Sequence, residues 1–260
     1  MNNKNNQYFS KTLEKGLIIL DLFDRDHQHR GLTEISRLTG INKTSTYRFV
    51  NTLVQLGYLR KSVNDKSIRL GPKAFVLGHH FFHGFDIFQS VKPIIDKTFF
   101  EQKISIDSAL LHGHTLISLY RREMPNIIYF RLPVIMDELY ARAMGKAVMA
   151  NLDPNEVSDI LENVKVTKLT SSTLSDKKAI LEDIELTRHR GYSINNEEYV
   201  EGLICIGAPV TNYREKTIVG AVSLDFPTSD YSLDLIRGNY PGVLTKLASE
   251  VSEAVTAADI

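Results

Sequence analysis

Residues 31–57 read GLTEISRLTGINKTSTYRFVNTLVQLG, and this stretch decides how the N-terminal part of the chain folds. The pattern predicts a short helix over 34–39, which Thr33 caps and which Gly40 ends in the left-handed conformation. A second helix is predicted over 43–56, directly after a tight turn. Two short helices joined in this way are typical of a helix-turn-helix.

The second helix has a capped start, an apolar face and a polar face without acids. Asn42 can cap its first turn, and Gly57 follows its last residue. The side chains at helical spacing that we expect in the core are Thr46, Phe49, Val50, Leu53 and Leu56. Cations, hydroxyls and amides on the other side can meet phosphates and base edges. The predicted DNA contacts of this helix are Lys43, Thr44, Ser45, Tyr47, Arg48 and Asn51.

Two strand-like runs follow the helix pair. LRKS at 59–62 and SIRL at 67–70 flank a turn-rich connection, which predicts a β-hairpin. A hairpin after two such helices indicates a winged helix-turn-helix rather than an ordinary helical hairpin. Its cations are placed to bind the DNA backbone, and they are Arg60, Lys61, Lys66 and Arg69.

Charge is divided unevenly along the 260 residues. Residues 1–72 hold 12 Lys and Arg against 6 Asp and Glu, a net charge of +6, whereas the whole chain is neutral. The remainder therefore carries −6. A basic module joined to an acidic one is the pattern of a nucleic-acid-binding domain attached to a domain of another function.

Composition excludes several other classes. With 43% hydrophobic residues the chain can form a sizeable core, in one or two domains. No apolar run is long enough to span a bilayer, and the polar N-terminus lacks the apolar segment of a secretory signal, so we expect a cytoplasmic protein. The single cysteine, Cys205, excludes an internal disulfide framework and a cysteine-rich zinc site.

We predict four segments along the chain. Residues 1–9 form a disordered tail, 10–71 the winged helix-turn-helix, 72–102 linker and dimerisation helices, and 103–260 a second domain. A first helix over 11–25 is expected to bury Leu13, Leu17 and Leu20. The linker is expected to be a helix broken at Gly78, Gly84 and Pro93, whose phenylalanines, Phe75, Phe81, Phe82, Phe85 and Phe88, cover a partner chain or the next domain.

The second domain alternates between strand and helix patterns. Strands are expected over 105–112, 115–122, 127–134, 192–194, 204–210 and 217–226, with a turn at His112 to His114. Helices are expected over 142–152, 153–161, 176–190 and 243–255, the third capped by Ser175 and burying Ile180, Ile184 and Leu186. The fold class is therefore α+β, with one mixed sheet in the second domain.

Five blocks in this order resemble the IclR-type bacterial transcriptional regulators over nearly the whole chain. They are the helix-turn-helix block that begins LTEISRLTG, the RLGP at 69–72, ARAMGKAVMA at 141–150, GYSINNEEYVEGL at 191–203, and CIGAPV followed by VGAVSLD at 205–225. The resemblance implies a winged helix-turn-helix, a dimerising linker helix and a C-terminal domain of GAF/PAS-like shape that binds a small effector. It also implies dimers that pair into tetramers.

The resemblance further implies where the effector pocket lies in this chain. It is formed before the GKA segment, at the first residue of NNEE, at the cysteine of CIGAP and at alternate residues of the strand near the end. The corresponding positions, with Arg142 beside them, are Arg142, Ala143, Met144, Asn195, Cys205, Ser223 and Asp225. Asn195 and Asp225 depart from relatives that bind small keto acids, and a carboxylate disfavours an anionic effector. A polyol, amide, ureido or aromatic effector thus competes with a keto acid.

We therefore predict a ligand-responsive regulator, with repression favoured over activation, that binds a palindromic double-stranded DNA operator as a homodimer or a dimer of dimers. We expect no cofactor, no bound metal and no catalytic residues. Two alternatives stay open at this point. One is an enzyme with Cys205 as its nucleophile, and the other is a metal or redox sensor that uses Cys205 or the cluster of His79, His80 and His83.

Overall fold

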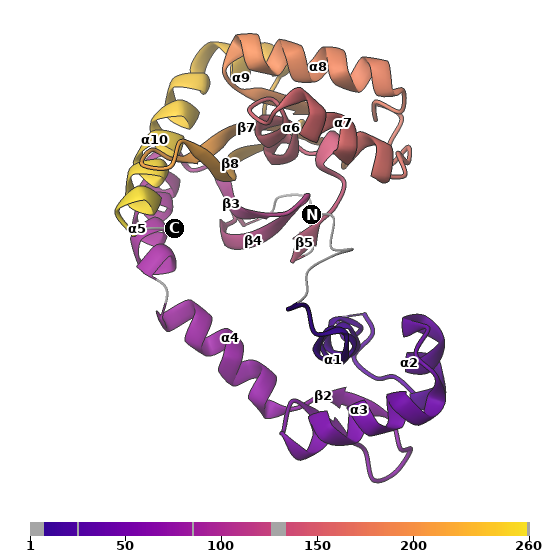
Figure 1. The fold of residues 1–260 in the computed structure, drawn as a ribbon. Helices are drawn as coiled ribbons and strands as arrows, with labels where there is room; N and C mark the ends of the chain where they lie inside the picture. The colour runs from indigo at the N-terminus through magenta and orange to yellow at the C-terminus, as the bar shows by residue number, and fades with distance from the viewer. Residues whose placement is uncertain (1–7, 25, 85, 126–133, 259–260) are drawn as a thin grey trace. The chain divides into compact units, whose positions relative to one another are not determined.

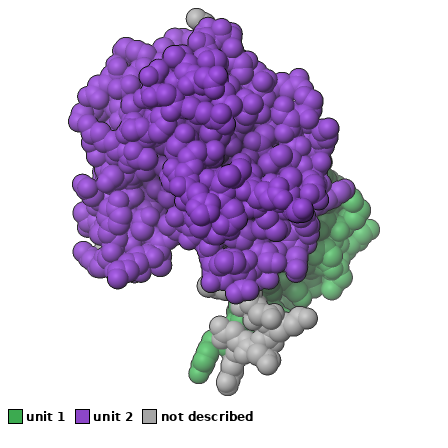
Figure 2. All heavy atoms as spheres, turned by 90° about the horizontal axis from the view of Figure 1, so that it is seen from above, with its two compact units in different colours: residues 1–85 green, residues 86–260 purple. Residues whose placement is uncertain are grey.

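The computed structural model describes residues 8–24, 26–84, 86–125 and 134–258, with the backbone alone for those between 81 and 87. The chain forms two compact units, residues 1–85 and 86–260, which Figure 2 shows in two colours. The predicted boundaries at 9, 71 and 102 remain predictions. None of the described helices is long and apolar enough to cross a membrane.

The described residues of the first unit form four helices and a β-hairpin (Figure 1). Its elements are α1 (Lys11–Asp21), α2 (Leu32–Thr39), α3 (Lys43–Gln55), β1 (Leu59–Lys61), β2 (Ile68–Leu70) and α4 (Pro72–Gly84). The hairpin strands are antiparallel, and Arg30 pairs with Ile68 through two backbone hydrogen bonds. One core joins the three first helices to the hairpin through Ile19, Ile35, Val50, Leu59 and Ile68.

The turn between α2 and α3 is as predicted, but the start of α2 is not. Gly40 has φ +67°, and the Asn42 side chain accepts a hydrogen bond from the Ser45 backbone N–H at 2.9 Å. Thr33 is not the cap of α2. The helix α2 begins at Leu32, one residue before Thr33. The Glu34 carboxylate accepts a hydrogen bond from the Gly31 N–H at 3.4 Å and so satisfies the backbone donor at the start of the helix.

Three leucines expected in the first core are exposed instead. Leu13 and Leu17 are 62% and 52% exposed, and Leu56, after the last turn of α3, is 51% exposed. The helix α1 also ends at Asp21, before residue 25. The stripe that faces the core contains Ile19 and Phe23, four residues apart, so α1 is rotated relative to the leucine stripe that the spacing suggested.

The segment 72–102 forms two continuous helices, α4 and α5 (Asp86–Gln102), and is not broken at Gly78 or Pro93. Pro93 removes one backbone donor from the interior of α5. Burial of Val91, Ile95 and Phe99 against the sheet of the second unit offsets that loss. Phe75 is 74% exposed on α4, whereas the side chains of Phe81, Phe82 and Phe85 lie outside the described residues.

The second unit is built on one six-stranded sheet with strand order β5-β4-β3-β8-β7-β6. The strands are β3 (Ser105–His112), β4 (Thr115–Arg122), β5 (Ile135–Met136), β6 (Ser193–Asn196), β7 (Leu203–Asn212) and β8 (Thr217–Pro227). Every described pair runs antiparallel, so the α+β class is confirmed but the prediction of mixed strand directions is wrong. The strand predicted over 127–134 falls mostly outside the described residues.

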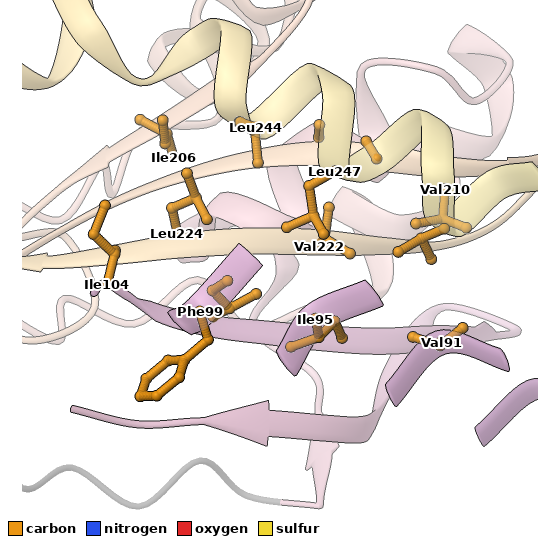
Figure 3. Close-up of a cluster of buried hydrophobic side chains, with 14 of the residues drawn as sticks. Val91, Ile95, Phe99, Ile104, Ile206, Val210, Val222, Leu224, Leu244 and Leu247 are labelled. Atoms are coloured by element: carbon orange, nitrogen blue, oxygen red, sulfur yellow. The ribbon is translucent and has the colours of Figure 1, made fainter. Parts of the chain in front are cut away.

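Helices cover both faces of this sheet (Figure 1). On one face lie α5 and α10 (Pro241–Ala257), and Figure 3 shows Leu244 and Leu247 of α10 beside Ile206, Val222 and Leu224 of the sheet. The short helix α9 (Leu233–Asn239) precedes α10 and was not predicted. The other face carries the 3-10 turn η2 (Leu139–Ala141) and the helices α6 (Ala143–Met149), α7 (Pro154–Asn163) and α8 (Lys177–Arg190).

The helices predicted in the second unit lie where they were expected, but α6 ends at Met149 instead of residue 152, α7 ends at Asn163 instead of residue 161, and α10 is two residues longer at each end. Asp153 caps α7, with Pro154 as its first residue, and Gly191 ends α8 with φ +82°. Ser175 is not the cap of α8, because the carboxylate of Asp176 accepts from the Ala179 N–H at 3.1 Å. Leu186 points outward and is 60% exposed, in contrast to the buried Ile180 and Ile184.

Candidate functional site

The first candidate site is the outer face of α3 together with the hairpin. Lys43, Thr44, Tyr47 and Arg48 are exposed, while Ser45 and Asn51 are half-buried. The first turn of α3 contains no acid. Burial of Lys43 or Arg48 would exclude a helix that contacts DNA, so their exposure is the required condition for this site.

The hairpin extends this cationic face. Arg60, Lys61 and Lys66 are exposed, and the Lys61 ammonium lies 5.3 Å from the ring centroid of Tyr47 on α3. Arg69 is only half-buried, but its Nε is fully buried and has no hydrogen-bond partner among the described residues. Three of the four predicted hairpin cations are therefore free to reach a phosphate backbone, and Arg69 is placed less well.

The second candidate site lies on the sheet face of the second unit that α6 covers. In the strand register, Asp107 of β3 is opposite Ser223 of β8, and Asp225 of β8 is opposite Cys205 of β7. Cys205 is in turn opposite Asn195 of β6. Residues paired in register share a face, so a row of polar side chains crosses four strands.

This polar row, the start of α6 and the segment after β6 enclose one cavity. All seven predicted effector residues line it, and four further lining residues were not predicted, namely Asp107, Tyr199, Val200 and Leu203. The sequence placed Asp107 in a predicted strand, and this was the available signal for it. No local pattern of residues indicates that β3 pairs with β8, so the place of Asp107 beside this cavity was not predicted. The effector-binding role of these residues remains a prediction.

The cavity is small. Its volume is about 30 Å³, which is room for about two water molecules. Pockets for small organic ligands are typically about ten times larger or more. Tyr199 and Val200 line it from the segment between β6 and β7, and Leu203 lines it from the first position of β7. A ligand larger than water therefore requires these side chains, or the backbone that carries them, to move.

Arg142 supplies the only arginine on the lining of this cavity within the described residues. Its side chain is 5% exposed, with the guanidinium carbon 3.6 Å from the ring centroid of Tyr199 and Nη2 3.2 Å from the Glu138 carboxylate. Its Nε is buried without a hydrogen-bond acceptor among the described residues. Since a buried unpaired donor is costly, this N–H is available to an acceptor on a ligand or a water molecule.

Two buried carboxyl groups face the same cavity. Asp107 and Asp225 are each 2% exposed, and Arg121 Nη1 lies 2.8 Å from Asp107 Oδ2 and 3.8 Å from Asp225 Oδ2. The Ser223 hydroxyl donates to Asp225 Oδ1 at 3.1 Å. Asp107 Oδ1 and Asp225 Oδ2 are buried acceptors without a hydrogen bond among the described residues. Burial, and next the charge of Asp225, raise the pKa of the Asp107 carboxyl well above its usual range.

Cys205 is half-buried beside these acids. Burial and the neighbouring Asp225 raise the pKa of its thiol well above the ordinary value, so the thiol is protonated at neutral pH. No histidine lies among the described residues that line the cavity. A thiol nucleophile needs a lowered pKa or an adjacent base, and the surroundings of Cys205 supply neither in the described part of the chain.

Asn195 is used mainly by the protein itself. Its amide nitrogen donates to the Ala141 carbonyl, and its amide oxygen accepts from the Glu198 N–H at 3.0 Å. The side chain is 2% exposed. Both ends of the amide are thus paired, and Asn195 positions the wall of the cavity more than it offers groups to a ligand.

His79 and His80 are the members of the histidine cluster whose side chains the structure describes. The rings of His79 and His80 lie 6.2 Å apart, and the side chain of His83 is outside the described residues. Among the described residues, no group of three or more His, Cys, Asp or Glu side chains is arranged to hold a metal ion.

The Asp107→Asn variant is expected to be more stable than the parent protein at pH 7 and to lose this advantage on acidification. A carboxyl group whose pKa is raised by folding stabilises the folded protein while it is protonated. For Asp107 this stabilisation is complete below about pH 3.9, the pKa in the unfolded chain, and it is lost as the pH rises through the pKa in the folded protein. Asparagine has the same shape and does not ionise. Thermal unfolding followed between pH 4 and 8 tests this.

Asp159→Asn is the control, because Asp159 is an exposed carboxylate on α7. It should shift the melting temperature by only a small amount, because its side chain is exposed. A stability difference for Asp107→Asn that grows as the pH falls would contradict the assignment of a destabilised buried carboxylate.

Comparison with known proteins gives the family. The model of the IclR helix-turn-helix domain matches residues 12–62, and that of the bacterial transcriptional regulator IclR C-terminal domain matches residues 79–253. The chain is 30% identical over 229 residues to the HTH-type transcriptional regulator KdgR of Escherichia coli K12, covering 85% of this chain and 84% of that protein. It is 26% identical over 247 residues to the transcriptional repressor IclR of the same organism, covering 94% and 89%.

Solved structures share the fold. An IclR transcriptional regulator from Silicibacter sp. TM1040 superposes with a TM-score of 0.83 at 23% identity, covering 94% of this chain and 96% of that one. An IclR homologue from Microbacterium hydrocarbonoxydans, solved with 4-hydroxybenzoate, gives a TM-score of 0.76 at 18% identity, covering 95% and 99%. With both family models matched in chain order and these relatives aligned over most of its length, the chain belongs to the IclR family of bacterial transcriptional regulators.

Proposed function

We propose that this IclR-family regulator contacts operator DNA through α3 and the hairpin, and that a small effector in the cavity of the second unit changes this binding. The observation that carries the proposal is a cationic helix face without acids in its first turn in one unit, and a small cavity lined by two buried carboxyl groups and a buried arginine in the other. Repression is favoured over activation because a relative that aligns over 94% of the chain is a repressor.

The DNA contact is argued from exposed charge. Lys43 and Arg48 on α3 and Arg60, Lys61 and Lys66 on the hairpin are exposed cations. The N-terminal residues of a recognition helix meet base edges in the major groove, while a neighbouring hairpin meets the phosphates. Thr44, Tyr47 and Asn51 add hydroxyl and amide groups that can bond to either.

The effector class follows from the groups that line the cavity. Asp107 Oδ1 and Asp225 Oδ2 are buried carboxyl oxygens without a hydrogen bond among the described residues, and Arg142 Nε is a buried donor without an acceptor there. A ligand that satisfies all three presents groups that can donate or accept, such as hydroxyls or amides, to the carboxyl groups and an acceptor to Arg142. Such a pattern favours a polyol or an amide over a small keto acid, whose charge would meet two carboxyl groups. The 4-hydroxybenzoate complex of the Microbacterium homologue supports a small-molecule site in a protein of this fold.

Homodimerisation on a palindromic operator is part of the proposal. Phe75 and Leu77 of α4 are 74% and 63% exposed, which is a large apolar surface within one turn of the helix. A second copy of the chain would bury it. Sedimentation equilibrium that gives the 29.4 kDa mass of a single chain at micromolar concentration would contradict this part.

The whole proposal is tested by binding to DNA as salt is varied. Sites selected in vitro by the protein from random duplexes should be palindromic, and their affinity should fall by orders of magnitude as salt rises from about 50 to 200 mM if about six or more phosphates are neutralised. Lys61→Met should make the slope of log K against log salt shallower by about one. An affinity that is insensitive to salt would exclude phosphate contacts.

The effector is sought by thermal shift. A ligand at about a hundred times its dissociation constant adds about 2.7 kcal/mol to the stability of the unit that binds it. A panel of polyols, amides, ureido compounds, aromatic acids and keto acids distinguishes the classes. A hit that raises the melting temperature of the parent protein, but not of Asp225→Leu, and that changes operator affinity would support the cavity as the site.

A further inference from the structure

A buried lysine lies beside the cavity but does not line it. Lys146 of α6 is 1% exposed, and its Nζ is 2.6 Å from both carboxylate oxygens of Glu198 and 2.8 Å from Asp183 Oδ2 on α8. The same ammonium donates to the Ile194 carbonyl at 3.3 Å. The three N–H donors of the lysine are thereby used by Glu198 and Ile194, so Asp183 interacts through charge alone.

The cluster Lys146–Glu198–Asp183 joins the two walls of the cavity. Lys146 is on the helix whose first residues, Ala143 and Met144, line one wall. Glu198 directly precedes Tyr199 and Val200, which line the other wall from the segment at 197–202. A rigid link between this helix and this segment fixes the distance between the walls.

Stability alone does not explain why the link is ionic. Burial raises the pKa of Glu198 against the opposing effect of Lys146, and one lysine faces two carboxylates. A buried ion pair is often no more stabilising than apolar side chains of the same volume, whereas it does fix a geometry because removal of one partner leaves a buried charge. The arrangement is therefore suited to hold one position of the segment.

Other contacts hold the segment at the same residue. The Glu198 N–H donates to Asn195, and its carbonyl accepts from the Thr173 hydroxyl at 2.6 Å. Beyond Glu198, the guanidinium of Arg142 at the start of α6 stacks on the ring of Tyr199 in the segment. Release of the Glu198 carboxylate thus frees the part of the segment that closes the cavity from its ionic anchor on α6.

We propose that Lys146, with Glu198 and Asp183, is a positioning group that keeps the segment at 197–202 closed over the effector cavity and so sets how readily a ligand enters. The role of the ligand as an effector rests on the function proposed above, but the closing of the segment over the cavity does not depend on that function. Ligand entry opens the segment against the Lys146–Glu198 contact, so weakening that contact makes the cavity accessible while the sheet and its core stay folded.

The single thiol of the chain reports on this closing. Cys205 is the one cysteine in the sequence and lines the cavity, which has no room for an aromatic disulfide or a maleimide until it opens. In the full-length protein, Lys146→Met should be labelled by Ellman's reagent at least about tenfold faster than the parent under native conditions. Loss of the lysine charge would by itself disfavour the thiolate and slow labelling, so acceleration reports opening.

Labelling through local opening is distinguished from labelling through global unfolding by measuring the labelling rate and the unfolding constant of each variant. The labelling rate of each variant is compared with its unfolding constant from urea denaturation, since labelling through global unfolding rises only in proportion to that constant. Lys178→Met is the matched control, because Lys178 is an exposed lysine on α8 whose side chain is 83% exposed. It should be labelled at the parental rate.

In Glu198→Gln the lysine is retained, and the labelling rate of this variant is compared with its unfolding constant in the same way. If Lys146→Met does not fold, this variant tests the proposal in its place. Labelling that is unchanged in these variants, or that rises only as much as the global unfolding constant, would overturn the proposal. Neither DNA nor an effector enters the measurement. Failure to bind operator or any metabolite would therefore refute the proposed function and leave the labelling result intact.

Discussion

Arg48→Ala is expected to weaken binding to the selected operator by about 5- to 150-fold, the effect of losing about 1–3 kcal/mol of base or phosphate contact. Arg48 is exposed in the first half of α3, on the face that also presents Thr44 and Asn51. A guanidinium at this place can donate two hydrogen bonds to a guanine edge. Fluorescence anisotropy with a labelled duplex measures the loss.

The control for Arg48→Ala is Arg237→Ala, which removes an exposed arginine from α9 in the second unit. That variant should bind the operator as the parent does, and both should keep the parental melting temperature. Binding to sites altered one base pair at a time then shows whether Arg48 reads sequence, because a lost base contact relaxes preference at one position only. Parental affinity of Arg48→Ala would remove α3 as the recognition helix.

Gly145→Ala is expected to destabilise the second unit by about 3 kcal/mol or more, or to prevent it from folding. A Cβ at Gly145 would lie 2.2 Å from the Leu139 carbonyl oxygen and 2.4 Å from the Leu139 Cα. These are backbone atoms of η2, so relief requires η2 and α6 to separate, and overpacking of a tight core typically costs about 1–3 kcal/mol and occasionally more. Ala143 and Met144 would move away from the cavity with α6.

Urea denaturation followed by tyrosine fluorescence and circular dichroism measures this loss. The two units need to be followed separately, because a two-domain chain is not expected to unfold in one transition. Gly238→Ala is the matched control, since Gly238 is also in a helix of the second unit and a Cβ there meets nothing within 4 Å. That change should be neutral or stabilise by up to about 1 kcal/mol. A parental midpoint for Gly145→Ala would show that α6 is not held against η2.

The helix-turn-helix was predictable because its determinants are local. Gly40 and Asn42 adopt the conformations and the capping bond that their residue types favour, and the spacing of Thr46 and Val50 gives the buried face of α3. The strands β3, β4, β7 and β8 and the last helix of the second domain were predictable for the same reason, since alternating or helical spacing of apolar residues follows from which face is buried.

The errors occurred where the sequence offered two local choices or where packing overrode a local preference. Asp176, and not its neighbour Ser175, accepts from the Ala179 N–H in the first turn of α8, and α2 begins after Gly31 instead of after Thr33. Pro93 would end an isolated helix, but α5 continues because its apolar face is buried on the sheet. The rotation of α1 likewise follows from packing and not from its leucine spacing.

The sequence by itself determined the two-part plan, the helix α3 with its exposed cations and, through resemblance, seven residues that line one cavity. Only the tertiary structure placed Asp107 beside Asp225, and Lys146 against Glu198 and Asp183. The physical reason is register. Alternation along a strand fixes which face a side chain occupies, but the neighbour of each strand and the residue opposite each position depend on pairing between segments far apart in the chain.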